Sequence, residues 1–104
     1  MKPTKEDILQ ALYMLKPTLR QKGVAKIALF GSFATATQTP YSDIDIAIVK
    51  REDFLKHFRA YDYFEMRNEL RNTLMKKFHR NVDIFDMDST SPLKEDIQKE
   101  AIYV

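Results

Sequence analysis

The sequence predicts an α/β fold, in which helices cover a small mixed sheet. Three observations predict it. Apolar residues recur at helical spacing in several segments, short apolar runs of strand length separate these segments, and 44% hydrophobic with 31% charged residues is typical of an ordinary folded domain. A chain of 104 residues suits one domain with a real core. We therefore expect residues 1–104 to form a single domain, without a second substrate-binding domain.

The first predicted element is a helix that begins after Thr4. Thr4 followed by Asp7 is typical of a helix cap with acidic residues in the first turn. Apolar residues then follow at helical spacing: Ile8, Leu9, Leu12 and Leu15. We expect Pro17 to interrupt this helix and to open a second short helical turn over residues 17–21, since proline is tolerated at a first helical position. Gly23 is the expected stop.

The next segment contains two predicted strands joined by a short helix and a turn. Residues 27–30 form a short apolar run, which indicates a buried strand that ends at Gly31. We expect a short helix over residues 32–37 and a turn over residues 39–42. Residues 43–49 alternate as a strand does. One face carries three isoleucines and the other carries two aspartates and an alanine: Ile44, Ile46 and Ile48 against Asp43, Asp45 and Ala47.

The remainder of the chain predicts a long helix, a third strand and a final helix. Over residues 60–78 an apolar stripe recurs at spacings of three and four: Tyr63, Met66, Leu70, Leu74 and Phe78. Residues 82–85 form the third strand, and Ser91 and Pro92 start a last helix that runs through Ala101. The long helix is a suitable crossover, so we expect the third strand to lie beside the second and parallel to it.

Three aspartates occupy the front ends of the second and third strands. Asp43 and Asp45 share one strand face about 7 Å apart, and Asp83 lies inside an otherwise apolar strand. Two carboxylates about 4 Å apart repel by roughly 4 kcal/mol at an effective dielectric constant of about 20. Hard divalent cations relieve this repulsion, and magnesium is the usual one beside phosphates. We therefore predict that the three aspartates bind two metal ions, which clamp the attacking and leaving oxygens of a phosphoryl displacement.

Gly31 and Ser32 are the predicted phosphate-binding residues. A glycine at a strand end lets the backbone approach a ligand closely, and the helix expected after it would offer free amides and a positive dipole end to an anion. The Ser32 hydroxyl adds a donor. For this turn to meet the acids, the first strand must end where the second begins, so these two strands should be antiparallel. The predicted sheet is therefore mixed, with three strands in the order 1-2-3.

Composition argues against several other classes of protein. The net charge is only +2 and the basic residues are scattered, so we expect no direct nucleic-acid ligand. The absence of cysteine excludes a disulfide framework and a thiolate metal site. No apolar run approaches the ~20 residues that a membrane span needs, and the amino terminus has no apolar signal core. We expect a cytoplasmic protein with no membrane partner.

These motifs together resemble the minimal nucleotidyltransferase family of the DNA polymerase β superfamily. The family pattern runs Gly-Ser-x-Ala-Arg-Gly, then a short turn, then Ser-Asp-Ile-Asp and a later Val-Asp-hydrophobic motif. The matching segments here are residues 29–36 (LFGSFATA), 39–46 (TPYSDIDI) and 81–84 (NVDI). The resemblance covers nearly the whole chain, including residues 15–17 and the closing residues 97–104, and it implies the nucleotidyltransferase fold.

The resemblance also implies an activity, a set of roles and a partner. Asp43 and Asp45 would bind both magnesium ions, Asp83 would complete one metal site and help to activate the acceptor oxygen, and Gly31 and Ser32 would hold the triphosphate of ATP. AMP would pass from ATP to an acceptor hydroxyl. Small members of the family are typically encoded beside a helical HEPN-domain protein and act as antitoxins, some by adenylylating a tyrosine on that toxin. A HEPN-domain toxin is thus the implied partner, in a hetero-oligomer.

Two departures from the family pattern leave other functions open. Thr35 and Ala36 stand where the family has Arg-Gly. Thr35 removes a charge-assisted donor, and Ala36 removes a freely turning residue, so nucleotide affinity and turnover are in question. A second hypothesis is a binding module that neutralises a toxin by occlusion. A third is an enzyme that modifies a small molecule of the aminoglycoside type, which the short chain disfavours unless a partner builds the pocket.

Several other residues have two interpretations. A surface position is favoured over a metal-ligand role for His57 and His79. A loop role is favoured over a place beside the metals for Asp86 and Asp88. Tyr41 lies beside the acids in the sequence and could stack on a base, although this is the less favoured interpretation. Core packing is favoured over an exposed partner surface for one aromatic group: Phe54, Phe58, Tyr61 and Phe64.

Overall fold

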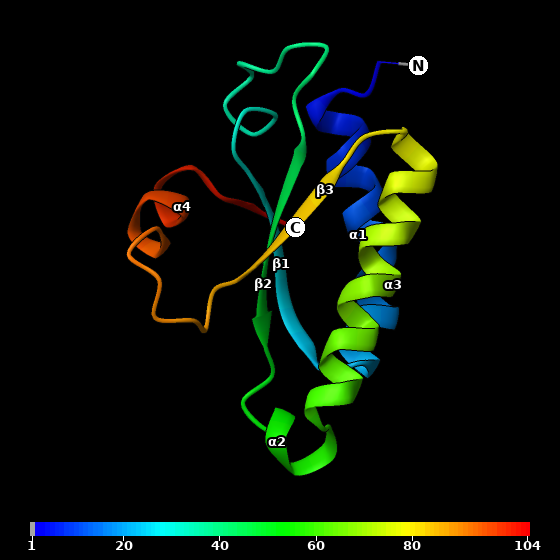
Figure 1. The fold of residues 1–104 in the computed structure, drawn as a ribbon, viewed down its shortest axis with the longest axis vertical. Helices are drawn as coiled ribbons and strands as arrows, with labels where there is room; N and C mark the ends of the chain where they lie inside the picture. Colours follow the sequence, from blue (N-terminus) through cyan, green and yellow to red (C-terminus); the bar gives the residue numbers. More distant parts are fainter. Residues whose placement is uncertain (1) are drawn as a thin grey trace.

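A computed structural model describes residues 2–104 and shows one sheet with helices on both of its faces (Figure 1). The sheet contains β1 (Val24–Phe30), β2 (Ile44–Lys50), β3 (Val82–Asp86) and β4 (Ile102–Tyr103), in the order β3-β2-β1-β4. The long helices α1 (Lys5–Gln21) and α3 (Ala60–Phe78) cover one face, and the short helix α4 (Lys94–Glu100) lies against the other. A further short helix, α2 (Phe54–His57), follows β2.

The strand directions confirm the mixed sheet predicted from the sequence. β1 and β2 pair antiparallel, while β2 and β3 pair parallel through the α3 crossover. The fourth strand was not predicted. It pairs antiparallel with β1, with Ala28 opposite Tyr103 and Leu29 opposite Ile102. Two residues are too short for an alternation pattern, so only the pairing with β1 identifies them as a strand. The last helix is shorter than the predicted range of 91–101: it begins only at Lys94, after a turn, and it ends at Glu100 because the chain is already extended at Ala101.

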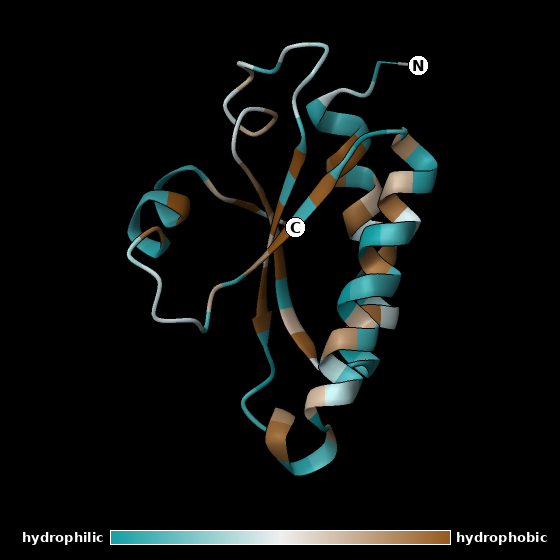
Figure 2. Cartoon of the chain, viewed as in Figure 1, coloured by the Kyte–Doolittle hydropathy of each residue, from teal (hydrophilic) through white to brown (hydrophobic). Residues whose placement is uncertain are grey.

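Two apolar layers lie on either side of the sheet (Figure 2). The larger layer contains the isoleucine face of β2 and the inner stripes of α1 and α3, which include Leu12, Leu70 and Leu74. The smaller layer lies under α4: Ala28, Ala47, Met87 and Ile97. In this layer the two small alanine side chains of the sheet pack with Met87 and with Ile97 of α4. Consequently both faces of β2 are buried near its middle, while Asp45 near its front end and Val49 and Lys50 at its other end are partly exposed.

Helix α1 is continuous, so the predicted interruption at Pro17 is wrong. Proline removes one helical hydrogen bond and costs about 3 kcal/mol in a helix interior. The carbonyl that loses its partner belongs to Tyr13, whose side chain is 63% exposed, so water can reach that side of the helix. Leu12 and Leu19 are buried on the opposite side, and each contributes about 1.5–3 kcal/mol. The burial of these residues outweighs the cost of the proline. The predicted cap at Thr4 and stop at Gly23 are both present.

The aromatic group near α2 and α3 divides between the core and the surface. Phe54 is buried and stacks on Phe58, with ring centroids 4.9 Å apart. Phe54 also fills the space beside Gly23, where a Cβ atom would lie 2.5 Å from the ring. Tyr61 and Phe64 are instead 73% and 57% exposed. Core packing is therefore confirmed for half of the group only. No helix within residues 2–104 is long and apolar enough to cross a membrane.

Candidate active site

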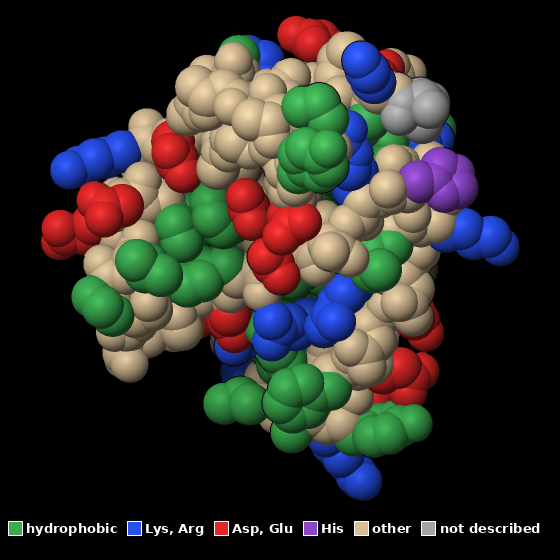
Figure 3. Space-filling model, turned by 45° about the horizontal axis from the view of Figure 1, so that its top comes forward, with side chains coloured by type: hydrophobic (Ala, Val, Ile, Leu, Met, Phe, Trp, Pro, Cys, Tyr) green, Lys and Arg blue, Asp and Glu red, His purple; other side chains and the backbone are tan. Residues whose placement is uncertain are grey.

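The front ends of β2 and β3 place two carboxylates side by side. In the parallel pair, Asp45 lies opposite Asp83, and Asp43 comes directly before the first residue of β2. The predicted strand began one residue earlier, at Asp43 itself. Asp45 is partly buried, whereas Asp43 and Asp83 are exposed. Viewed towards this end of the sheet, acidic side chains gather near the middle of the face, with Lys or Arg side chains on one side of them (Figure 3).

The surroundings of Asp45 disfavour its negative charge. Burial, followed by the neighbouring carboxylates of Asp83, Asp43 and Glu100 in that order, raises the pKa of the Asp45 carboxyl to about 6. At neutral pH the Asp45 carboxylate therefore carries its charge at a cost in free energy, which a cation bound nearby would relieve. This electrostatic strain is a common property of functional sites.

Gly31 brings the end of β1 against Asp45. Phe30, the last residue of β1, is paired with Asp45, and a Cβ atom on Gly31 would lie 2.2 Å from Asp45 Oδ2. The backbone of Gly31 also has a φ of +76°, which side chains rarely tolerate. Both the contact and the conformation therefore require glycine. The predicted proximity of the Gly31–Ser32 turn to the acids is what the antiparallel β1–β2 pairing produces.

The helix predicted over residues 32–37 is absent, and a tight turn takes its place. The Gly31 carbonyl accepts hydrogen bonds from the N–H groups of Ala34 and Thr35, both at 3.1 Å, and Thr37 N–H donates to the Ser32 carbonyl. The Thr35 hydroxyl also donates to Gly31 O at 3.2 Å. Such local side-chain hydrogen bonds compete with helix formation. The segment therefore offers a phosphate the free amides of a turn, without the dipole of a helix.

Ala36 closes this turn in a left-handed conformation, with a φ of 59°. This is the position at which the family pattern has glycine. A non-glycine residue costs roughly 1–2 kcal/mol in this region, part of which the greater flexibility of glycine in the unfolded chain would offset.

We expect Ala36→Gly to raise the free energy of unfolding by about 0.5–1 kcal/mol, as measured by urea denaturation. Ala101→Gly is a suitable control because Ala101 has an ordinary φ of −67°. That exchange should lower the stability. Equal effects of the two exchanges would show that Ala36 carries no backbone strain.

Glu100 is a member of the site that the sequence did not reveal. Its Oε1 accepts a hydrogen bond from Gly31 N–H at 3.0 Å, although the two residues are 69 positions apart. It is also one of the charges that raise the pKa of Asp45. No motif or spacing links Glu100 to the aspartates, because it reaches the site through the pairing of β4 with β1. The closing segment of the resemblance was the only sign that this part of the chain mattered.

The donor atoms in this site suit a hard divalent cation. All of the candidate ligands are carboxylate oxygens, the kind that Mg²⁺ prefers, and the carboxylates around Asp45 raise its pKa, as a site that lacks positive charge would. Within residues 2–104, however, no three His, Asp or Glu side chains lie close enough together to enclose an ion as they stand. Chemistry and charge therefore fit a magnesium site, and binding would require the exposed aspartates to turn.

Arg80 fixes the loop that carries Asp43. Its Nη1 donates to the carbonyls of Ser42 at 3.1 Å and Thr39 at 3.3 Å, and its guanidinium lies 5.7 Å from the ring centroid of Phe33. A pocket of about 360 Å³ opens beside Asp43, with Arg80 in its wall. Further lining residues are Tyr41, Met75 and His79. The two histidines are exposed, as expected, and Tyr41 is 93% exposed beside the acids.

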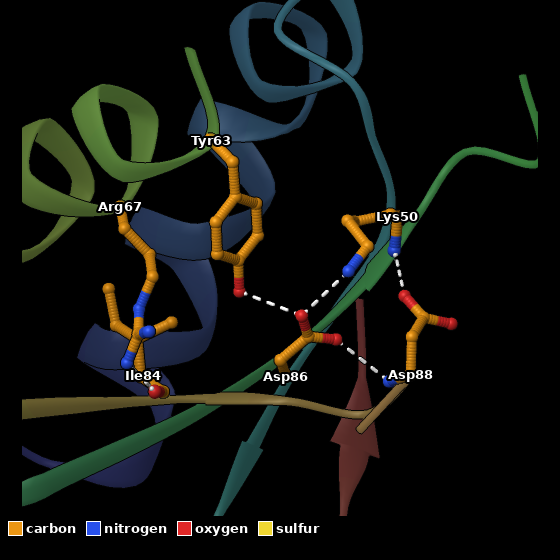
Figure 4. Close-up of polar contacts among 6 residues, drawn as sticks. All are labelled: Lys50, Tyr63, Arg67, Ile84, Asp86 and Asp88. Atoms are coloured by element: carbon orange, nitrogen blue, oxygen red, sulfur yellow. Dashed lines mark hydrogen bonds and ion pairs between the residues drawn. The ribbon is translucent and has the colours of Figure 1, made fainter. Parts of the chain in front are cut away.

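Asp86 and Asp88 lie away from the other acids. Asp86 is the last residue of β3, where its Oδ2 accepts hydrogen bonds from Lys50 Nζ at 2.8 Å and Tyr63 Oη at 2.9 Å (Figure 4). Burial alone would raise the pKa of Asp86, but these hydrogen bonds and one from Asp88 N–H outweigh it and lower the pKa. In the same cluster, Arg67 Nη2 donates to the Ile84 carbonyl. The cluster is a structural link between α3 and the sheet.

Comparison with known proteins identifies the family of the chain. The sequence pattern of the family described as "Polymerase beta, Nucleotidyltransferase" matches residues 14–104. Two Methanocaldococcus jannaschii proteins that carry the name "Putative protein adenylyltransferase" are 34% and 36% identical to the chain. Each match covers 97% of this chain and 98% of the relative.

Solved structures share the fold at lower sequence identity. One, described as "Structure of putative minimal nucleotidyltransferase", superposes with a TM-score of 0.70 at 21% identity, over 96% of this chain and 95% of the other. A second contains a tri-AMPylated Shewanella oneidensis HEPN toxin in complex with an MNT antitoxin. It superposes with a TM-score of 0.60 at 20% identity, over 96% of this chain and 71% of the other. Because the sequence pattern of the family matches residues 14–104, the chain belongs to the polymerase β nucleotidyltransferase family.

Proposed function

We propose that this nucleotidyltransferase transfers AMP from ATP to an acceptor hydroxyl, with residues 1–104 acting as one catalytic domain. The observation that carries the proposal is the register of the sheet, which sets Asp45 opposite Asp83 and places Gly31 against Asp45. This arrangement joins a set of oxygen ligands to a turn with free donors. Within residues 2–104, the backbone N–H groups of Ser32 and Phe33 have no hydrogen-bond partner and are available to a phosphate.

Each of the predicted site residues has its own role in the proposed displacement. Asp43, Asp45 and Asp83 would hold two Mg²⁺ ions, which when bound neutralise phosphate charge and lower the pKa of a coordinated hydroxyl. The Gly31–Ser32 turn binds the β- and γ-phosphates through its amides and the Ser32 hydroxyl. The acceptor oxygen forms a bond to the α-phosphorus, the bond from that phosphorus to the bridging oxygen breaks, and pyrophosphate leaves. Asp83, on the open edge strand, receives the proton of the acceptor hydroxyl. Positioning and charge neutralisation supply most of the rate.

The proposed acceptor is a tyrosine of a HEPN-domain toxin, for which the protein acts as a cytoplasmic antitoxin. Three observations support a protein acceptor. The acids lie at an open end of the sheet, where β3 is an edge strand. A structure with the same fold contains an AMPylated HEPN toxin bound to its antitoxin. The exposed Tyr61 and Phe64 provide apolar surface of the kind that partner proteins bind.

The test uses ATP labelled either at the α- or at the γ-phosphate, with Mg²⁺ and a HEPN-domain protein encoded beside the gene. AMP transfer moves only the α-label onto the acceptor, and omission of Mg²⁺ or addition of EDTA should abolish it. Tyr→Phe exchanges in the acceptor then identify the modified residue. Transfer of the γ-label would show a kinase instead, and transfer of neither label would leave this acceptor without support.

Occlusion of a toxin without catalysis is the second candidate, and Thr35 is the observation that favours it. The family's arginine is missing there, and the Thr35 hydroxyl is occupied with the turn itself. The double variant Asp43→Asn/Asp45→Asn discriminates between the two candidates. If it still neutralises the toxin in a growth assay, occlusion is supported, whereas loss of neutralisation supports catalysis. Modification of an aminoglycoside-type small molecule would appear in a separate growth assay, as protection of the cells against the drug.

A further inference from the structure

We propose that Glu100 is a positioning residue of the nucleotide site, which orients the phosphate-binding turn by accepting the hydrogen bond from Gly31 N–H. The inference rests on the proposed function, because it concerns the turn that would receive the phosphates of ATP. It assigns a function to α4, a helix that none of the motifs includes.

Glu100 is anchored by the elements on either side of it. It is the last residue of α4, which is held on the sheet by the buried side chain of Ile97. Two residues later, Ile102 in β4 pairs with Leu29 in β1. The backbone of Glu100 is therefore fixed relative to β1, and its side chain reaches the residue that directly follows β1. A carboxylate held in this way can determine the orientation of the peptide group that contains Gly31 N–H.

Gly31 needs such an anchor more than other residues would. Glycine has the widest choice of backbone conformations, and Gly31 lies just beyond the last residue of β1, where its N–H needs a partner outside the strand. Glu100 supplies that partner on one side of the residue. On the other side, the N–H groups of Ala34 and Thr35 bind the Gly31 carbonyl. With both peptide groups fixed, the amides of Ser32 and Phe33 have a set direction before any ligand arrives.

An opposite role is conceivable, in which the Glu100 carboxylate imitates a phosphate and must leave when ATP binds. The neighbouring charges argue against it. Glu100 already raises the pKa of Asp45, so the two groups are close enough to repel. If the Glu100 carboxylate left Gly31 N–H, it would lose the hydrogen bond that offsets its partial burial and its repulsion by the neighbouring acids. The Gly31 N–H is therefore a permanent partner of Glu100, and ATP uses the amides that follow it.

The experiment compares Glu100→Ala with Glu100→Gln in the full chain. Glutamine keeps an oxygen that accepts the Gly31 hydrogen bond, whereas alanine keeps none. We expect Glu100→Ala to weaken the binding of Mg·ATP by about tenfold in calorimetry, corresponding to one lost charge-assisted hydrogen bond. Glu100→Gln should stay within about threefold of the wild type. Glu95→Ala, an exposed exchange in the same helix, should not change the affinity.

Amide NMR measures the contact itself and separates it from a loss of folding. The chain has only two glycines, so the N–H resonances of Gly31 and Gly23 are readily distinguished. Glu100→Ala should shift and deprotect the Gly31 amide while the Gly23 amide is unchanged. Equal shifts of both amides would indicate a general structural effect and would overturn the assignment.

The binding results also distinguish the two proposals from each other. If the wild type binds Mg·ATP and Glu100→Ala binds it equally well or more tightly, the positioning role is wrong while the proposed function stands. The positioning role is also wrong if Glu100→Gln is as weak as Glu100→Ala. If the wild type binds no Mg·ATP, the proposed function fails, and the role of Glu100 fails with it.

Discussion

Asp45→Asn should reduce AMP transfer by about 100- to 1000-fold or more, while it makes the metal-free protein more stable. The rate falls because the exchange removes a proposed metal ligand from the centre of the site, and the loss of one electrostatic group that stabilises a transition state typically costs that much. Radiolabel transfer at saturating Mg²⁺ measures it. Asp96→Asn, an exposed exchange in α4, should leave the rate unchanged.

The gain in stability follows from the raised pKa of Asp45. The difference between about 6 and the ordinary 3.8 corresponds to about 3 kcal/mol at 1.36 kcal/mol per pKa unit. Because the side chain is partly exposed, solvent screening reduces this to about 1–2 kcal/mol. The penalty is fully present above pH 6, where the folded protein must carry the charge, and it vanishes below pH 4, where both states are protonated. Urea denaturation in EDTA at pH 8 and at pH 4 should therefore show a gap between variant and wild type that closes on acidification.

A constant gap across this pH range would show that burial and the neighbouring carboxylates do not raise the pKa of Asp45 in the folded protein. Added Mg²⁺ provides a further comparison, because a ligand that binds only the folded state stabilises it. It should raise the stability of the wild type more than that of Asp45→Asn. The reverse order would contradict Asp45 as a metal ligand.

Gly31→Ala should both destabilise the protein and strongly reduce transfer. The new Cβ atom would lie 2.2 Å from Asp45 Oδ2, and alanine would have to adopt a φ of +76°. The backbone conformation alone costs roughly 1–2 kcal/mol, and displacement of Asp45 adds to it, so we expect a total loss of about 2–4 kcal/mol. The transfer rate of the folded fraction should fall by about 100-fold, since a misplacement of about 1 Å has that effect on a catalytic group.

Gly23→Ala is the matched control for this variant. It has the same kind of strain, with a φ of +100° and a Cβ atom 2.5 Å from Phe54, but it lies at the other end of β1. Thermal unfolding should show a comparable loss of stability in both variants. Transfer per folded molecule should fall only in Gly31→Ala. If both variants lose transfer to the same extent, the contact of Gly31 with Asp45 has no special role.

Much of the fold followed from the sequence because its strongest patterns are long and local. The apolar stripe over residues 60–78 predicted α3 to the residue, and the alternation around Ile46 predicted both the strand and its buried face. The parallel direction of β3 followed from the long crossover. These features depend on periodicity along the chain, which is what a sequence shows directly.

The elements that the sequence did not predict depend on distant contacts or on single side chains. Pro17 stays within a helix because Leu12 and Leu19 are buried around it. Residues 32–37 form a turn in which the Thr35 hydroxyl takes part. Glu100 joins the site only through β4. In each case the decisive partner lies elsewhere in the fold or acts through one atom, so no pattern in the neighbouring residues could reveal it. The predicted roles of Asp43, Asp45, Asp83, Gly31 and Ser32 remain predictions for the experiments above.

The hydrogen bond between Arg67 and the Ile84 carbonyl has a consequence for how the protein behaves at high concentration. β3 is the outermost strand on its side of the sheet, and free carbonyls on such a strand invite pairing with another molecule. The guanidinium of Arg67, on the neighbouring helix α3, occupies the Ile84 carbonyl and hinders that pairing. Solutions of Arg67→Ala should consequently aggregate at concentrations at which the wild type stays dispersed.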